Sequence, residues 1–186
     1  FRRVLFRSIE AMLKRLETDY LDLIYIHNPD SPYSMDEYMS GLNKAVDSGL
    51  AKGVGVSNFS LEQLVRAIQI STHPIIAIQN VYSIFQKHDA SAELLEYCAS
   101  ENILFVAYSP FKLIIENEGY QKLLETFCEK YNCSPTQLAL AWLFNQENVV
   151  TIPKSTKKGH IDSNFASLGI EIDPQDMHEL NMLKSP

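Results

Sequence analysis

The sequence of 186 residues has no apolar run that approaches the ~20 residues needed to cross a bilayer. It also lacks an opening segment with the charged, apolar and small-residue regions of a secretory leader. Hydrophobic residues make up 46% of the chain and charged residues 21%, which suffices for one sizeable core. We therefore expect a single globular domain that binds no membrane and lies in the cytoplasm.

Cysteine and positive charge are both scarce. The three cysteines, Cys98, Cys128 and Cys133, are odd in number and fall in or beside predicted helices, which favours reduced thiols over a disulfide framework. Cys128 and Cys133 have no histidine nearby at zinc-ligand spacing, so we predict no metal site. A net charge of −7 leaves no basic excess to neutralise phosphates, which argues against a nucleic-acid partner.

The first eight residues, Phe1 to Ser8, read FRRVLFRS, a cation-rich octet without pattern that directly precedes a well-patterned helix. The octet resembles the translation of a common sequencing-adapter oligonucleotide fused to a gene fragment. We therefore interpret residues 1–8 as a non-native leader and exclude them from the fold. A genuine basic amino terminus is the alternative.

Helical and strand patterns alternate along the rest of the chain. Ile9, Met12, Leu13 and Leu16 have helical spacing, and a further helix is expected near residues 92–101. One helix is marked by Tyr120, Leu123, Leu124, Phe127 and Tyr131. Strands are predicted at residues 21–26, 51–56, 75–78, 103–107 and 149–152.

Helix boundaries are marked by capping signals. Ser34 with Glu37 and Ser60 with Gln63 have the spacing of capping boxes, and Gly49 supplies a left-handed stop for the first of these helices. A later helix begins at Ser134, followed by proline and three residues on by glutamine. Each of these signals is local and predicts where a helix starts or stops.

Strict alternation of strands and helices predicts an α/β fold with a parallel sheet. The pattern fits either an open doubly wound sheet or part of a closed barrel. A Rossmann site requires G-x-G-x-x-G after a strand, whereas residues 53–58 read GVGVSN, without the third glycine and within the strand. The dinucleotide fingerprint is absent.

Polar pairs follow all five predicted strands. In a parallel barrel these pairs lie at the carboxyl face, where active sites are built. Singly, each is ordinary turn chemistry. Together they supply an imidazole, amides, hydroxyls, an aromatic ring and a cation, which suit a flat, amide-bearing ring beside a phosphate. The pairs are His27-Asn28, Ser57-Asn58, Gln79-Asn80, Tyr108-Ser109 and Lys154-Ser155.

Several stretches resemble, in order and spacing, the signatures of the aldo-keto reductases. They are LETDYLDLIYIHNPD, GLAKGVGVSNFS, IQNVYSIFQ, VAYSPF, CSPTQLALAWLF and TIPKSTKKGHIDSN. The resemblance runs from about Ile9 almost to Pro186. It implies that residues 9–186 are the carboxyl-terminal part of one (β/α)₈ barrel domain, with strands 4 to 8 and their helices. It also implies an oxidoreductase that uses NADP(H) to reduce aldehydes or ketones.

The resemblance implies specific cofactor contacts. Ser57, Asn58 and Gln79 match the positions that hydrogen-bond the nicotinamide carboxamide. Tyr108 matches the aromatic residue that stacks on the nicotinamide ring, with Ser109 beside it. The adenosine end of the cofactor is matched by Lys154, Ser155 and Thr156 at the 2′-phosphate, by His160 near it and by Asn164 at the adenine.

His27 matches the histidine of the family's catalytic tetrad, which donates a hydrogen bond to the substrate carbonyl while a tyrosine protonates its oxygen. The resemblance places the tyrosine, a lysine and an aspartate on earlier barrel strands. We expect about three further βα units upstream, since such a barrel needs ~250 residues. The present chain is then inactive alone, and its parent a monomer or weak oligomer.

Two residues depart from the family pattern. His160 stands where an arginine is common and Ser163 where an acidic residue is common. Histidine lacks the permanently charged guanidinium fork, so 2′-phosphate recognition weakens unless Lys157 or Lys158 compensates. NADP(H) remains favoured, with NAD(H) as the alternative cofactor.

Two other functions fit parts of the pattern. Lys154 at a strand end resembles the nucleophile of a Schiff-base aldolase, although the neighbouring Ser155 and Lys157 favour anion binding instead. A non-catalytic, nicotinamide-binding regulatory or scaffold barrel is the second alternative, because function does not follow from fold alone.

Overall fold

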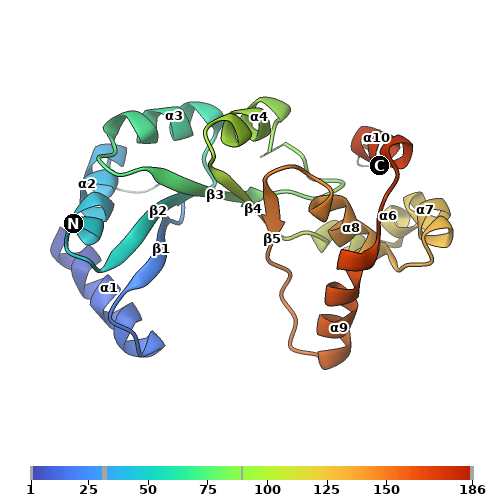
Figure 1. The fold of residues 1–186 in the computed structure, drawn as a ribbon, viewed down its shortest axis with the longest axis horizontal. Coiled ribbons are helices and arrows are strands. Elements are labelled where there is room, and N and C mark those ends of the chain that lie inside the picture. The colour runs from blue at the N-terminus through green and yellow to red at the C-terminus, as the bar shows by residue number, and fades with distance from the viewer. Residues whose placement is uncertain (1, 31–32, 89, 185–186) are drawn as a thin grey trace. The chain divides into compact units, whose positions relative to one another are not determined.

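A computed structural model describes residues 2–30, 33–88 and 90–184 (Figure 1). The chain forms two compact units. The first comprises Phe1–Gln79 and Glu96–Leu104, and the second Asn80–Leu95 and Phe105–Pro186. Within the described ranges, no helix combines the length and apolar character needed to cross a membrane.

The first unit is built from alternating helices and parallel strands. β1 pairs with β2 in parallel, and β2 pairs with β3 in parallel. Helix α2 packs against β2, α1 and α3, which buries Met39 and Leu42 together with Val54 of β2. The elements are α1 (Arg2–Leu16), β1 (Leu21–Ile26), α2 (Met35–Asp47), β2 (Ala51–Ser57), α3 (Leu61–Ile70) and β3 (Ile75–Val81).

The capping signals of the first unit are confirmed. The hydroxyls of Ser34 and Ser60 accept the amides of Glu37 and Gln63, and both capping boxes are complete. Gly49 has φ 73°, the left-handed conformation predicted at the end of α2. The strand ends that follow are therefore placed by locally specified helices.

The two glycines of β2 have a packing role. A Cβ at Gly53 would lie 2.5 Å from Cδ1 of Ile76, and one at Gly55 would lie 2.5 Å from Cε1 of Tyr25. Tyr25 is also the register partner of Gly55. These glycines make room for side chains of the neighbouring strands. The GVG sequence therefore has a packing explanation and does not require a bound phosphate.

The second unit pairs β4 with β5 in parallel and covers them with helices. Apolar α8 packs against β5, α9 and η1, and its Trp142 is fully buried. Helix α4 (Ala92–Ser100) contributes residues to both units. The other elements are β4 (Leu104–Tyr108), α5 (Lys112–Glu116), α6 (Glu118–Leu123), α7 (Glu125–Lys130), α8 (Pro135–Phe144), β5 (Val149–Thr151), α9 (Lys158–Ala166), η1 (Ser167–Gly169) and α10 (Pro174–Met182).

The structure differs from the sequence prediction at two places. The single helix predicted around Tyr120 to Tyr131 is wrong, because α6 ends and α7 begins at Leu124, whose side chain is fully buried at the break. Helix α1 starts at Arg2, so residues 2–8 are helical rather than unpatterned. The helical conformation of residues 2–8 does not show where this segment comes from. The interpretation of residues 1–8 as a non-native leader therefore stays a prediction.

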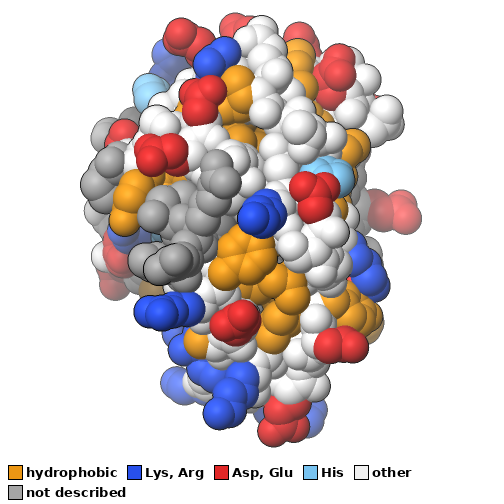
Figure 2. Space-filling view, turned by 90° about the vertical axis from the view of Figure 1, so that its left-hand side faces the viewer, with side chains coloured by type: hydrophobic (Ala, Val, Ile, Leu, Met, Phe, Trp, Pro, Cys, Tyr) orange, Lys and Arg blue, Asp and Glu red, His pale blue; other side chains and the backbone are white. Residues whose placement is uncertain are grey.

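The surface is mixed in character. Figure 2 shows a face on which hydrophobic side chains gather among scattered lysine, arginine, aspartate and glutamate side chains. Phe165 of α9 is 75% exposed, and Ile161, one turn earlier, is 51% exposed. Exposed apolar side chains of this size are typical of surfaces that contact another part of a protein or a partner.

Candidate functional site

The first unit brings together four of the predicted site residues at the carboxyl ends of its strands. Ile26 is in register with Val56, and Ser57 is in register with Gln79. His27 follows β1 directly and Asn58 follows β2 directly. His27, Ser57, Asn58 and Gln79, which we call the β1–β3 cluster, therefore lie at one edge of the three strands.

Hydrogen bonds connect the β1–β3 cluster. The Ser57 hydroxyl donates to the Gln79 carbonyl oxygen at 2.6 Å. The Asn58 side-chain amide donates to the His27 carbonyl oxygen at 2.8 Å and to the Ser57 hydroxyl at 3.2 Å. The Asn58 backbone N–H also donates to the Gln79 carbonyl oxygen, at 3.1 Å. Asn58 thus ties together the ends of all three strands.

Asn58 adopts a conformation that the sequence analysis did not predict. Its φ is 61°, in the left-handed region that asparagine tolerates better than most residues. The turn leads from β2 to Ser60, which caps α3. Asparagine between a strand and a capping serine is the local signal that could have predicted this turn.

Two side chains of the β1–β3 cluster can receive a ligand. The imidazole of His27 is exposed, and the side chain of Gln79 is half-buried. Neither side chain has a hydrogen-bond partner within residues 2–30, 33–88 and 90–184. Gln79 can pair with another amide, because its side chain carries both donors and an acceptor, and the His27 ring can donate to an oxygen.

The second unit places Tyr108 and Ser109 at the end of β4. Tyr108 is half-buried, and Ser109 has φ 55°, a left-handed conformation that the sequence did not signal. Ala107 is in register with Thr151, whose hydroxyl donates to the Ala107 carbonyl oxygen at 3.0 Å. The ends of β4 and β5 are thereby held side by side.

The remaining predicted residues follow β5. Lys154 and Thr156 are exposed, and the Ser155 hydroxyl accepts the Lys157 backbone N–H at 3.2 Å. Lys157 is the N-cap residue of α9, with no side-chain cap on the first turn of that helix. A helix start without a side-chain cap, next to lysine, is an environment suited to a phosphate.

Helix α9 carries the last two predicted residues on one face. His160 and Asn164 are four residues apart, a spacing that places side chains on the same side of a helix. His160 is exposed and Asn164 is half-buried. Lys158, considered above as a substitute for arginine, forms an ion pair with Asp162 at 2.6 Å. Its charge is therefore partly neutralised.

Comparison with known proteins decides the family. The aldo/keto reductase family model matches residues 2–184. The chain belongs to the aldo/keto reductase family. The predicted resemblance to this family is confirmed.

Similar proteins agree with this assignment. A Glycine max protein named "Probable aldo-keto reductase 1" is 31% identical over 200 residues, which cover 92% of this chain and 57% of that protein. The thermostable aldo-keto reductase Tm1743, solved with the inhibitor epalrestat, is 36% identical, with a TM-score of 0.91 over 97% of this chain and 66% of that one. An aldo-keto reductase from Klebsiella pneumoniae, solved with NADPH, is 25% identical, with a TM-score of 0.84 over 95% and 63% of the two chains.

These structural matches confirm the predicted fold class, a partial (β/α)₈ barrel with parallel strands and surrounding helices. The chain spans 57% of the length of the Glycine max relative and 66% of Tm1743.

Proposed function

We propose that this chain provides the nicotinamide-binding and carbonyl-polarising part of an NADP(H)-dependent oxidoreductase that reduces aldehydes or ketones to alcohols. Family membership supports the reaction class, and the NADPH complex of the Klebsiella pneumoniae relative supports the cofactor. The observation that carries the proposal is the β1–β3 cluster, where the side-chain amide of Gln79 has no hydrogen-bond partner among the described residues and lies beside the hydrogen-bonded Ser57 and Asn58.

The proposed roles follow from the hydrogen bonds. Gln79 pairs with the nicotinamide carboxamide, and the Ser57 hydroxyl supports it from the same edge. Asn58 uses its side-chain N–H groups on the His27 carbonyl and the Ser57 hydroxyl, so it also positions the backbone after β1. Since these contacts fix an amide, they decide which face of the nicotinamide ring is offered to the substrate.

The family resemblance assigns further cofactor contacts to residues of the second unit. Tyr108, with Ser109 beside it, provides an aromatic face for the nicotinamide ring. Lys154, Ser155 and Thr156 provide charge and hydroxyls for the 2′-phosphate. His160 and Asn164 extend this set along α9 toward the adenosine. These donors fit a phosphorylated dinucleotide better than an uncharged ligand.

His27 is the proposed catalytic residue. The bound cofactor supplies the hydride. The imidazole donates a hydrogen bond to the substrate carbonyl oxygen, which draws negative charge away from the carbon that accepts the hydride. The oxygen then requires a proton from a general acid, which the family resemblance assigns to a tyrosine that none of the described residues matches. We expect the chain alone to bind cofactor and not to turn over substrate.

The surroundings of Lys154 do not favour the Schiff-base aldolase alternative. Its side chain is exposed, whereas a nucleophilic lysine is activated by desolvation or by a neighbouring cation in an apolar pocket. The residues around it, Ser155 and Thr156, are hydroxyl donors that suit an anion.

Fluorescence titration of the chain with NADPH and NADH tests the proposed nicotinamide site. Gln79→Leu should weaken binding of NADPH and NADH by a similar factor of about fivefold, because each cofactor loses the same uncharged amide pairing, worth ~1 kcal/mol. The matched control is Gln175→Leu on exposed α10, which should leave both affinities unchanged. If Gln79→Leu has no more effect than the control, the nicotinamide does not lie at the β1–β3 cluster.

A further inference from the structure

Helix α7 ends in a Schellman motif that brings two cysteines together. Asn132 has φ 48°, and its N–H donates to the Glu129 carbonyl at 3.3 Å. The N–H of Cys133 donates to the Cys128 carbonyl at 3.0 Å. In this motif the residues in the positions of Cys128 and Cys133 commonly touch through their side chains. The contact follows from the way the helix stops.

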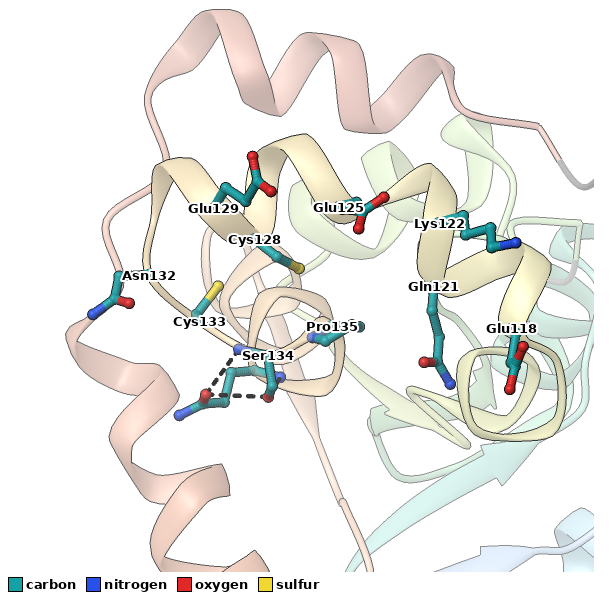
Figure 3. A pocket seen from close by; sticks show the side chains of 11 residues that line it. Glu118, Gln121, Lys122, Glu125, Cys128, Glu129, Asn132, Cys133, Ser134 and Pro135 are labelled. Atoms are coloured by element: carbon teal, nitrogen blue, oxygen red, sulfur yellow. Dashed lines mark hydrogen bonds between the residues drawn. The ribbon is translucent and has the colours of Figure 1, made fainter.

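Cys128 and Cys133 both line one pocket (Figure 3). Each lies close enough to the other to influence its pKa, and both cysteines are free and half-buried. A disulfide joins residues whose Cα atoms are about 4.4–6.8 Å apart and whose Cβ atoms point toward each other. The backbone hydrogen bond between Cys133 and Cys128 holds these two residues side by side at the helix end, which favours such a bond. By contrast, the third cysteine, Cys98, is fully buried and lies on a different helix, α4.

The thiol pair opens onto a negatively charged pocket. An open pocket of about 570 Å³ is lined by both cysteines and by residues of α6, α7 and the start of α8. Its charged lining residues are Glu118, Glu125, Glu129 and Lys122, so negative charge is in excess. Glu125 is close enough to Cys128 to help raise its pKa. A cationic reagent is therefore attracted to the thiols and an anionic one repelled.

We propose that Cys128 and Cys133 form a redox-active dithiol, which closes to an intramolecular disulfide by exchange with small, positively charged disulfides. The proposal does not depend on cofactor binding. It rests on the Schellman motif, on the pocket that both cysteines line and on the charge of that pocket.

The exchange balances in two steps, written for the diamine disulfide cystamine. The Cys133 thiolate attacks one sulfur of cystamine, the reagent's S–S bond breaks, and one cysteamine leaves and takes up the proton that Cys133 released. Cys128, deprotonated by solvent, attacks the Cys133 sulfur of the mixed disulfide, and the second cysteamine leaves as a thiol. The two cysteines lose two hydrogen atoms, and the reagent disulfide is reduced to two thiols.

Cys133 is proposed as the attacking residue because burial raises its pKa while the neighbouring Cys128 lowers it, whereas the neighbouring Cys133 and Glu125 both raise the pKa of Cys128. Burial raises the pKa of both thiols, that of Cys128 to about 12. Reaction is consequently slow at neutral pH and accelerates as the solution becomes more alkaline.

Mass spectrometry of the folded chain tests the proposal. The chain is incubated with cystamine or with anionic glutathione disulfide at mildly alkaline pH and low salt, and intact mass and alkylation-resistant cysteines are followed in time. Cystamine should give a product two hydrogen atoms lighter, with Cys128 and Cys133 joined. It should react several-fold faster than glutathione disulfide, and added salt should reduce this difference. Circular dichroism is used to check that the chain and each of the variants described next are folded.

Variants separate the two steps. Cys128→Ser should accumulate a stable mixed disulfide on Cys133, and Cys133→Ser should react more slowly. The control, Cys98→Ala, should close the disulfide at the rate of the unaltered chain. In urea the advantage of cystamine should disappear, because the pocket and the helix end unfold.

Two outcomes overturn the proposal. If the unaltered chain accumulates separate mixed disulfides on Cys128 and Cys133 without an internal bond, the two thiols do not form a functional pair. If glutathione disulfide reacts as fast as cystamine at low salt, the charge of the pocket does not select the reagent.

Discussion

At the scale of single residues, His160 is where the proposed 2′-phosphate site departs from the family pattern. It is exposed on α9, one helical turn from Asn164, and Lys158 is engaged by Asp162. A histidine side chain is not permanently charged and lacks the planar, two-pronged guanidinium with which arginine binds a phosphate. The proposed phosphate site therefore depends chiefly on Lys154, Ser155 and Thr156.

His160→Arg should tighten binding of NADPH more than of NADH. The guanidinium adds charge-assisted, bidentate contacts to the phosphate that NADH lacks, worth on the order of 1 kcal/mol or more. The measurement is a fluorescence titration of both cofactors. His178→Arg, which adds the same charge on exposed α10, is the control. Equal gains for NADPH and NADH at position 160 would show that its side chain does not reach the phosphate.

The residues of the β1–β3 cluster show what a sequence reveals about a site. The polar pairs at His27, Ser57 and Gln79 predicted their common edge, because parallel strands end on the same side. The left-handed backbone of Asn58 and the bond from its side chain to the His27 carbonyl were not predicted. The hydrogen bond depends on register between strands, which local sequence does not contain, whereas the turn at Asn58 has a local signal in the asparagine itself.

At the scale of helices, the capping boxes were predictable and the break between α6 and α7 was not. Ser34, Ser60 and Ser134 accept hydrogen bonds from residues three positions ahead, so their signals are complete within one turn. Leu124 has no turn-forming chemistry of its own, and its burial against other elements sets the break. Tertiary packing overrides propensity at such a position.

Helix α10 is attached to α7 by a charged network around Asp173. One oxygen of Asp173 accepts the Asp176 N–H as an N-cap, and the other accepts Lys130 at 2.7 Å and the Tyr131 hydroxyl at 3.1 Å. Asp176 also binds Lys130, at 2.7 Å. The Lys130 ammonium lowers the pKa of Asp173 from its ordinary value of 3.8 to about 2.

This pKa predicts an acid dependence of stability. Asp173 has a lower pKa in the folded chain than in the unfolded chain, so its contribution is fully present above about pH 4 and is lost as pH falls toward about 2. Asp173→Asn should lower the thermal midpoint at neutral pH and reduce its fall with acid, as followed by circular dichroism. The control is Asp162→Asn, which removes the exposed ion pair between Lys158 and Asp162 on α9. An unchanged acid dependence in Asp173→Asn would exclude this network as its source.

At the scale of the whole chain, two strands are paired on one side only among the described residues. β1 pairs with β2 alone, and β5 pairs with β4 alone. Leu21, Leu23 and Tyr25 of β1 are half-buried, while Val150 of β5 is 41% exposed and Ile152 beyond it 50% exposed. An unpaired strand with apolar side chains is a template for pairing with another chain.

The 186-residue chain should therefore associate and should bind cofactor without reducing carbonyls. Association follows from the unpaired sides of β1 and β5. The lack of turnover follows from the proposed chemistry, since His27 can polarise a carbonyl but a tuned acid that protonates its oxygen is typically worth 10²- to 10⁴-fold. Light scattering after size exclusion measures the first expectation, and NADPH oxidation with a reactive aldehyde measures the second.

Val150→Lys should reduce association, because a lysine on an exposed edge strand disfavours pairing with another chain, whereas Lys52→Ala on β2 should not. A monodisperse monomer with robust turnover would contradict both expectations, and would require that the described residues themselves include the proton donor.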